Sequence, residues 1–329
     1  MMIQTQYLPT IQYQFEPVNG AISDAEWRII RAPHPHDDEH RGGDRDRGRY
    51  GLWWRHPPDL AGERVGFIGQ YQADDPAIAQ PLLHHACEQL RQQECTIAIA
   101  PVDGSTWQRY RVAIAGTEEP PFFLEPDYPT TLVPQLDAAG FSPIAHYYSA
   151  LNTDLTDIDS RSPRVHAKFQ QLGVTIRSLN LANLDVELAN IYPLICTSFQ
   201  HNFLYHPLSK EHFIQQYQAL LPYIQPELVL LAEHHDRLVG LLFCVPNWLE
   251  VQRGEPLKTI ILKTVAVHPD RTYAGLGQLL FEQCHAIAQT RGFVRAIYAL
   301  IHAHNPCWNL VRRYAQPCRR YAVFAKSLT

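Results

Sequence analysis

The spacing of apolar residues changes between two periods in the C-terminal half of this chain. The run Thr259–Val267 is apolar and rich in β-branched residues, which is typical of a buried strand. Beyond it, apolar residues recur at the interval expected for one face of a helix, at Leu276, Leu280, Cys284 and Ala288. The run Val294–Ile301 then returns to a strand-like pattern. The pattern predicts a strand, a turn, a helix and a second strand.

The same order of elements is predicted once in the N-terminal half. Arg64–Tyr71 and Thr96–Ala100 have the pattern of strands, and the helix between them has apolar residues at Ile78, Leu82, Ala86 and Leu90. Shifting the chain on itself aligns Leu82 with Leu279, Cys87 with Cys284 and Gln92 with Gln289. We interpret the two halves as copies of one unit. Chance similarity between two such units is the alternative.

The two copies differ at the turn before the helix. The second copy has RTYAGLG, Arg271–Gly277, whereas the first has DDPAIAQ, Asp74–Gln80. A turn that leads from a strand into a helix leaves N–H groups unpaired, and glycines let an anion approach them closely. Asp75 and Pro76 instead supply a helix cap and a residue without an N–H group. An anion site is therefore predicted only in the second copy, although two closely spaced glycines alone are a weak signal.

The segment Lys263–Gly292 resembles the acetyl-CoA motif of the GNAT superfamily, which is a strand, then Arg/Gln-x-x-Gly-x-Gly/Ala, then a helix. Leu228–Phe243, with His235 and Asp236 at its tip, resembles the preceding hairpin of that family, and Arg320–Lys326 resembles its closing strand. The resemblance covers about residues 180–329. A dinucleotide-binding unit is disfavoured because its G-x-G-x-x-G is absent. The resemblance implies an α/β (α+β) protein of tandem GNAT folds, each a mixed, mostly antiparallel twisted sheet flanked by helices.

The resemblance also implies the cofactor site. Acetyl-CoA or another acyl-CoA would be held by the strand, by the loop and by an asparagine before the next helix. These residues are Val265, Ala266, Val267, Arg271, Thr272, Tyr273, Ala274, Gly275, Leu276, Gly277 and Asn305. The first position of the motif is Thr272, and Arg271 is displaced from it by one residue. Asn305 could equally cap a helix that begins at Pro306.

One tyrosine and three histidines are the candidate catalytic residues. Tyr314 occupies the region in which the family places its general acid, but packing in an amphipathic helix explains this tyrosine equally well. The strand that carries the cofactor lacks the carboxylate that serves as base in some relatives. His268, His302 and His304 are candidate bases, and a structural role is the more common one for such histidines.

The composition of Asn152–Pro163 is that of a linker. We therefore expect a degenerate GNAT-like domain without a cofactor loop at residues 1–151, a linker at 152–166 and a GNAT acyltransferase domain at 167–329. In the first domain, Leu132–Tyr148 resembles the terminal helix, the Gly-Phe turn and the closing strand of the family.

Composition restricts the partners and the compartment. The formal net charge is −5, so no global basic field attracts nucleic acid. The seven cysteines form no C-x-x-C pair, and neither a signal peptide nor a membrane-length apolar run is evident, so we expect a cytoplasmic protein with reduced thiols. The polar stretch Pro33–Arg49 contains His34, His36 and His40, but its mixed charges favour a solvated loop over a metal site.

These features predict an N-acyltransferase that moves an acyl group, with acetyl expected, from CoA to a primary amine by direct attack in a ternary complex. The expected acceptor is a small-molecule or peptide amine. We expect no metal cofactor and no nucleic-acid or membrane partner, and the question of a homodimer stays open. The alternative is a non-catalytic acyl-CoA-binding or interaction protein that retains the fold. A third interpretation makes the first half a dimerisation or partner-binding module.

Overall fold

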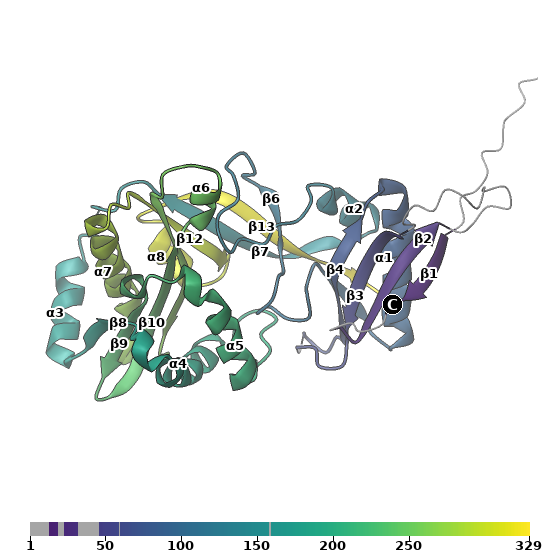
Figure 1. Cartoon of the computed structure of the whole chain (residues 1–329). Coiled ribbons are helices and arrows are strands. Elements are labelled where there is room, and N and C mark those ends of the chain that lie inside the picture. The colour runs from purple at the N-terminus through teal and green to yellow at the C-terminus, as the bar shows by residue number, and fades with distance from the viewer. Residues whose placement is uncertain (1–12, 19–22, 32–45, 59, 158) are drawn as a thin grey trace, which may run out of the picture. The chain divides into compact units, whose positions relative to one another are not determined.

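The computed structural model describes residues 13–18, 23–31, 46–58, 60–157 and 159–329. The chain forms two compact units. The first comprises residues up to 111, 129–144 and 323–329, and the second comprises 112–128 and 145–322. Each unit contains mixed, mostly antiparallel strands flanked by helices (Figure 1), which confirms the predicted fold class. The histidines at positions 34, 36 and 40 lie outside the described residues.

The units exchange segments across the boundary that the sequence suggested. Residues 145–151 precede the predicted linker but belong to the second unit, and residues 323–329 at the C-terminus belong to the first. The predicted linker 152–166 includes the end of strand β7, Ser142–Asn152, and the beginning of helix α3, Ser162–Leu172. Strand pairing therefore divides the chain differently from local composition.

The described residues of the first unit form strands of one sheet and two helices. Its strands are β1 Tyr13–Pro17, β2 Ala25–Arg31, β3 Asp46–Trp53, β4 Val65–Ala73, β5 Ile97–Ala100 and the end of β13 Gln316–Ser327, in that order across the sheet. The helices are α1 Pro76–Gln92 and α2 Leu132–Ala138. Among the described strands of this unit, only β4 and β5 are parallel, with Val65–Phe67 paired to Ile97–Ile99. The predicted apolar residues of α1 are all buried. Residues 46–49, which were expected to be in a loop, begin β3.

The second unit has the sheet order β13-β7-β12-β11-β10-β9-β8, with β6 beside β13. Besides β7 and β13, its strands are β6 Val112–Ala115, β8 Thr175–Ser178, β9 Leu230–His234, β10 Arg237–Pro246, β11 Thr259–Val267 and β12 Arg295–His302. Its helices besides α3 are α4 Leu184–Phe199, α5 Lys210–Leu220, α6 Trp248–Gln252, α7 Leu276–Thr290 and α8 Cys307–Val311. The predicted hairpin tip is confirmed, because His235 and Asp236 connect β9 and β10 with positive φ angles.

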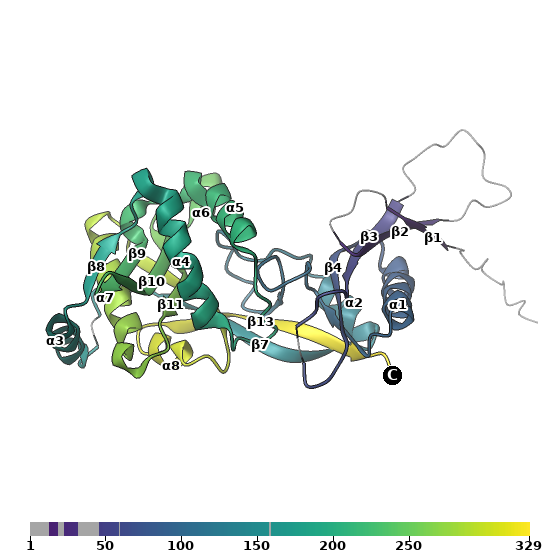
Figure 2. The same ribbon diagram turned by 90° about the horizontal axis from the view of Figure 1, so that it is seen from below.

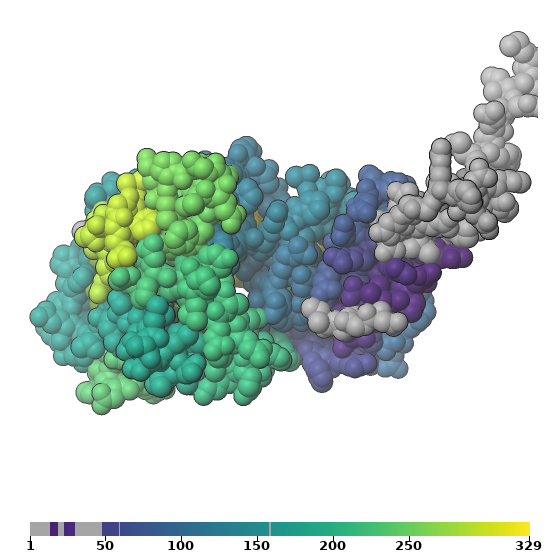
Figure 3. Space-filling model, viewed as in Figure 1, coloured from purple at the N-terminus to yellow at the C-terminus, as the bar shows by residue number. Residues whose placement is uncertain are grey.

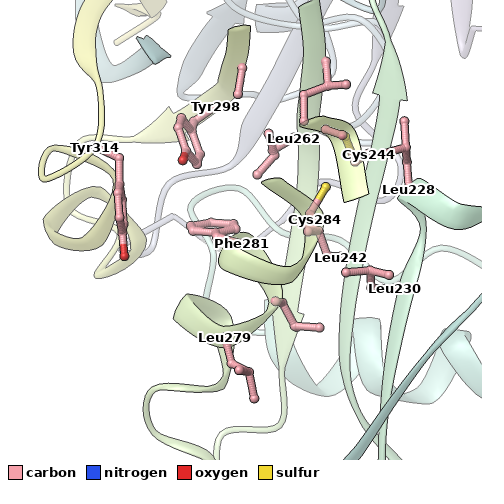
Figure 4. Close-up of a cluster of buried hydrophobic side chains, with 14 of the residues drawn as sticks. Leu228, Leu230, Leu242, Cys244, Leu262, Leu279, Phe281, Cys284, Tyr298 and Tyr314 are labelled. Atoms are coloured by element: carbon pink, nitrogen blue, oxygen red, sulfur yellow. The ribbon is translucent and has the colours of Figure 1, made fainter. Parts of the chain in front are cut away.

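Helix α7 packs on one face of this sheet. Leu276, Leu280, Cys284 and Ala288 are buried, as the apolar spacing predicted, together with Leu242 and Leu262 from the strands (Figure 4). Gly240 allows the close approach, because a Cβ atom there would lie 2.9 Å from Leu276 Cδ2. The glycine thereby sets how near the beginning of α7 lies to the sheet.

Helices α4 and α5 cover the opposite face. Successive strand residues point to opposite sides of a sheet, and Phe243, next to Leu242, packs against Tyr217 of α5 with ring centroids 5.3 Å apart. The view from below separates the two layers (Figure 2), and the space-filling view shows the surface that the α4–α5 region presents (Figure 3). The carboxyl ends of β11 and β12 therefore lie between two helical layers.

A buried ion pair fixes the segment 116–128 to this unit. The Arg319 guanidinium contacts Glu125 at 2.5 Å, and their side chains are 6% and 2% exposed. Arg319 also donates to the Gly116 carbonyl, and the Tyr321 hydroxyl and the Phe122 N–H donate to the same carboxylate. Removing one partner would leave a buried charge uncompensated.

We therefore expect Glu125→Ala to lower the free energy of unfolding by about 3–5 kcal/mol, measured by urea denaturation. Glu118→Ala removes an exposed carboxylate from the same segment and should change it by less than about 0.5 kcal/mol. Equal effects of the two substitutions would show that the ion pair does not stabilise the unit.

Candidate functional site

Strands β11 and β12 part from each other midway along their length. Only Thr259–Leu262 of β11 pairs with β12, in parallel with Arg295–Tyr298, although β11 continues to Val267. The register between β10 and β11 shifts by one residue at Lys263, because Phe243 faces Thr264 whereas Cys244 faces Leu262. This β-bulge lies where the strands separate, and bulges bend the strand that carries them. The result is a gap between two neighbouring strands.

The backbone of β11 presents hydrogen-bonding groups to this gap. The His268 N–H donates to Val239 of β10 at 2.9 Å. N–H groups alternate in direction along a strand. The Ala266 N–H therefore also points to β10, whereas the N–H groups of Val265 and Val267 point to the gap. The Val267 carbonyl, on the same side, accepts from Ser198 Oγ at 3.1 Å. Of the three predicted strand contacts, Val265 and Val267 thus have backbone donors available to a ligand.

The predicted cofactor loop continues directly from β11. Its first amides are used within the loop. Thr272 N–H donates to Asp270 Oδ1 at 2.8 Å, Tyr273 N–H to the Asp270 carbonyl and Ala274 N–H to the Arg271 carbonyl. The Tyr273 hydroxyl contacts His234 Nδ1 at 3.0 Å, and the Arg271 side chain is exposed. These residues shape the loop and orient the first turn of α7.

The next amides, of Gly275, Leu276 and Gly277, have no acceptor in the described part of the chain. They occupy the beginning of α7, where the helix dipole adds positive potential. Gly275 has φ +99°, which requires glycine, whereas Gly277 does not. A Cβ at Gly277 would lie 3.8 Å from Val265 Cγ2, in ordinary contact distance. The fold therefore does not require glycine at 277, whereas close approach of a ligand would explain it.

Tyr314 is brought against helix α7. Its hydroxyl donates to Glu282 Oε1 at 3.2 Å, and its ring lies at the edge of the apolar cluster (Figure 4), with its centroid 6.2 Å from that of His285. The Glu282 side chain is 7% exposed and also accepts from Ser162, Gln278 and His166. Burial, and next the carboxylate, raise the pKa of Tyr314 well above its usual value. Tyr314 is therefore protonated at neutral pH and directs its proton to a carboxylate on α7.

Asn305 begins the turn into α8. Its Oδ1 accepts from the Cys307 N–H at 2.8 Å, which is a capping interaction. The candidate bases lie at strand ends. His268, after β11, contacts Arg237 at 3.1 Å, and His302, at the end of β12, accepts from the His304 N–H at 3.2 Å. His268 and His302 thus flank the gap, and the contacts assign neither of them a catalytic role.

Residues 188–313 match the model of the acetyltransferase (GNAT) family. The matched segment includes the gap, the loop and α7. This segment belongs to the GNAT acetyltransferase family. The family uses an acyl-CoA co-substrate and acts on amine acceptors, so membership supports acyltransferase activity of the GNAT domain in general.

The "Bacterial ceramide synthase" of Caulobacter vibrioides is 24% identical over 192 residues, which are 58% of this chain and 50% of that protein. The chain thus spans half the length of this relative. A GCN5-related N-acetyltransferase from Sphaerobacter thermophilus has TM-score 0.51 and 13% identity over 92% of this chain and 80% of that chain. A tandem GNAT protein from the clavulanic acid biosynthesis pathway has TM-score 0.50 and 13% identity over 96% and 84%. The tandem fold is therefore a known arrangement.

Membrane-spanning helices and metal clusters are both absent from the described part of the chain. In the ranges that the structure describes, no helix is long and apolar enough to cross a membrane. Within the same ranges, no cluster of three or more His, Cys, Asp or Glu side chains is arranged to hold a metal ion.

Sequence reasoning missed the polar residues that pack on α7 of the GNAT domain. Gln278, Glu282 and His285 follow a helical spacing on one stripe, and all three side chains are buried. The His285 Nε2 lies 2.9 Å from the Tyr298 hydroxyl, at the last pair before β11 and β12 part. This spacing within an otherwise apolar helix was the available signal.

Burial lowers the pKa of His285 from 6.5 to about 4. Unfolding would let this imidazole take up a proton between these values, so stability should fall as pH decreases from about 6.5 to about 4, by up to about 3 kcal/mol. His285→Gln should lose less stability over this range, measured as urea unfolding at several pH values. Parallel pH profiles for the two proteins would contradict this assignment.

Proposed function

We propose that the chain is an N-acyltransferase that binds acyl-CoA in its second unit. The observation that carries the proposal is the group of unpaired amides at Gly275, Leu276 and Gly277, next to a strand that has parted from its neighbour. The amides and the helix dipole suit the pyrophosphate. The Val265 and Val267 N–H groups suit the pantetheine arm and the thioester carbonyl.

Transfer would then follow the direct route. The neutral amine attacks the thioester carbon, the N–C bond forms, the C–S bond breaks, and the proton lost by the amine balances the thiolate that leaves as CoA. Fixed N–H donors stabilise the oxyanion of the tetrahedral intermediate. Tyr314 is the proposed proton donor, because it occupies the region in which the family places its general acid and its phenol is protonated at neutral pH.

The first unit is proposed to be a degenerate copy without cofactor. Strands β4 and β5 also part, after Phe67 and Ile99, but the Asp103 carboxylate accepts from Gln70 N–H at 2.6 Å in that position. At the beginning of α1 the Asp75 carboxylate accepts from Ala77 N–H at 2.8 Å. A negative charge thus occupies each place where the cofactor would need a donor.

The acyl group and the acceptor are proposed from the resemblance to the family. Acetyl is the acyl group expected from the motif, and a primary amine is the acceptor. The Caulobacter relative is named a ceramide synthase, so long-chain acyl-CoA and lipid amines belong in the assay beside acetyl-CoA and small amines.

The cofactor site can be tested at Gly277, where a side chain does not strain the backbone. Gly277→Asp should fold and gain up to about 1 kcal/mol from the helix dipole, yet it should lose measurable acetyl-CoA binding because its carboxylate repels the pyrophosphate. Isothermal titration calorimetry should give one site for the unmodified chain.

Gly277→Ala is the matched control and should retain most of the affinity. Binding to Gly277→Asp that equals the unmodified chain would place the cofactor elsewhere, and two sites per chain would mean that the first unit also binds it. Binding without turnover of any amine would favour the alternative of a non-catalytic acyl-CoA-binding protein.

Tyr314→Phe tests the proposed proton donor. We expect kcat to fall by about 100-fold with little change in the acetyl-CoA affinity, because general acid catalysis contributes about that much. Glu282→Gln keeps Tyr314 and replaces the carboxylate that accepts from its hydroxyl and also from Ser162 and Gln278. An unchanged kcat for Tyr314→Phe would assign this tyrosine to packing.

A further inference from the structure

Helix α3 contributes a cation to the loop from outside the family segment. The family model matches from residue 188, whereas α3 is Ser162–Leu172 and lies beside α7 (Figure 1). Its Lys168 Nζ donates to the Ala274 carbonyl at 2.7 Å. We propose that Lys168 is a positioning residue that holds the Ala274–Gly275 peptide in the orientation needed to bind the cofactor pyrophosphate. This inference rests on the proposed function.

One peptide group connects the lysine to the anion site. The C=O and N–H groups of a trans peptide point in opposite directions. Because Lys168 holds the Ala274 carbonyl on the α3 side, the Gly275 N–H points away from α3, together with the other unpaired amides at the beginning of α7. The lysine thus acts through the peptide rather than by contact with the phosphates.

This peptide has a competing orientation. Ala274 has φ −60° and ψ 124°, and Gly275 has φ 99° and ψ −10°, which are the angles of a type II turn. A type I turn differs mainly by rotation of the central peptide, and it is open to most residues at the second central position. That rotation would direct the Ala274 carbonyl toward the anion and the Gly275 N–H away from it. A hydrogen bond to the carbonyl favours the type II form.

Helix α3 is well placed to hold the lysine still. Phe169 is 1% exposed, and a Cβ at Gly275 would lie 3.8 Å from both Phe169 and Val165. On the same helix, Ser162 and His166 both contact the buried Glu282 of α7. The Lys168 ammonium lies 4.8 Å from the Phe169 ring centroid. These contacts hold helix α3, and with it Lys168, next to the loop.

The position of Lys168 also bears on the altered motif. Thr272 stands where the motif usually has Arg or Gln, and the Arg271 side chain is exposed. A cation on α3 supplies positive charge near the same loop and polarises the peptide whose N–H would bind the anion. Lys168 therefore takes over part of what the motif residue would contribute.

The test compares acetyl-CoA affinities by calorimetry in the full chain. Lys168→Met should weaken binding about tenfold, which is the loss of one charge-assisted hydrogen bond, while Lys168→Arg should recover most of the affinity. Arg164→Met removes an exposed charge from the same helix and should bind as the unmodified chain does. The melting temperatures of all variants without ligand should agree closely.

Three results would overturn the inference. They are unchanged affinity in Lys168→Met, an equal loss in Arg164→Met, and a loss in Lys168→Met that Lys168→Arg does not recover. If Lys168→Met does not fold, Lys168→Gln replaces it under the same criteria. Failure of the unmodified chain to bind acetyl-CoA would instead overturn the proposed function, and the inference with it, so the two failures are distinguishable.

Discussion

The parting of β11 from β12 is the constraint on which the site depends. Parallel neighbours normally satisfy each other's backbone groups, and these two strands do so only as far as Leu262 and Tyr298. Beyond that point the bulge at Lys263 turns β11 away while its other edge stays paired with β10. The groups of Val265 and Val267 are left facing a gap, and the chain continues directly into the loop and α7. A strand that stayed paired would offer a ligand no donors.

Helix α7 connects this gap to the rest of the unit. One side of the helix packs on the sheet through apolar residues, and Gly240 lets its first turn approach closely. The other side is polar and buried, because Glu282 accepts hydrogen bonds from Ser162, Gln278 and Tyr314. These bonds fix α3 and the segment after α8 to the helix that carries the proposed anion site. The loop is therefore supported from both sides of the helix.

The same arrangement of elements occurs in both units, but the backbone donors are occupied in the first and available in the second. Both contain a strand that parts from its parallel neighbour and a helix that follows. In the first unit, Asp75 and Asp103 accept from backbone N–H groups near the helix and the parting strand. A carboxylate both uses the donor and repels a phosphate. In the second unit glycines occupy the corresponding turn, and the N–H groups stay available. The difference lies in a few side chains rather than in the fold.

Local patterns along the chain were enough to predict the strand–turn–helix–strand order, the boundaries of β11 and the buried stripe of α7, because these depend on periodicity and backbone preference. They also indicated the loop, since glycines and a helix N-terminus are local features.

Tertiary contacts were needed to show which amides are free: Thr272, Tyr273 and Ala274 bond within the loop, and Ala266 points to β10. Tertiary contacts also placed residues 145–151 and 323–329 in their units. They brought Lys168 to Ala274 and Tyr314 to Glu282. Such contacts join residues distant in sequence, and their partners depend on packing, which no local pattern encodes.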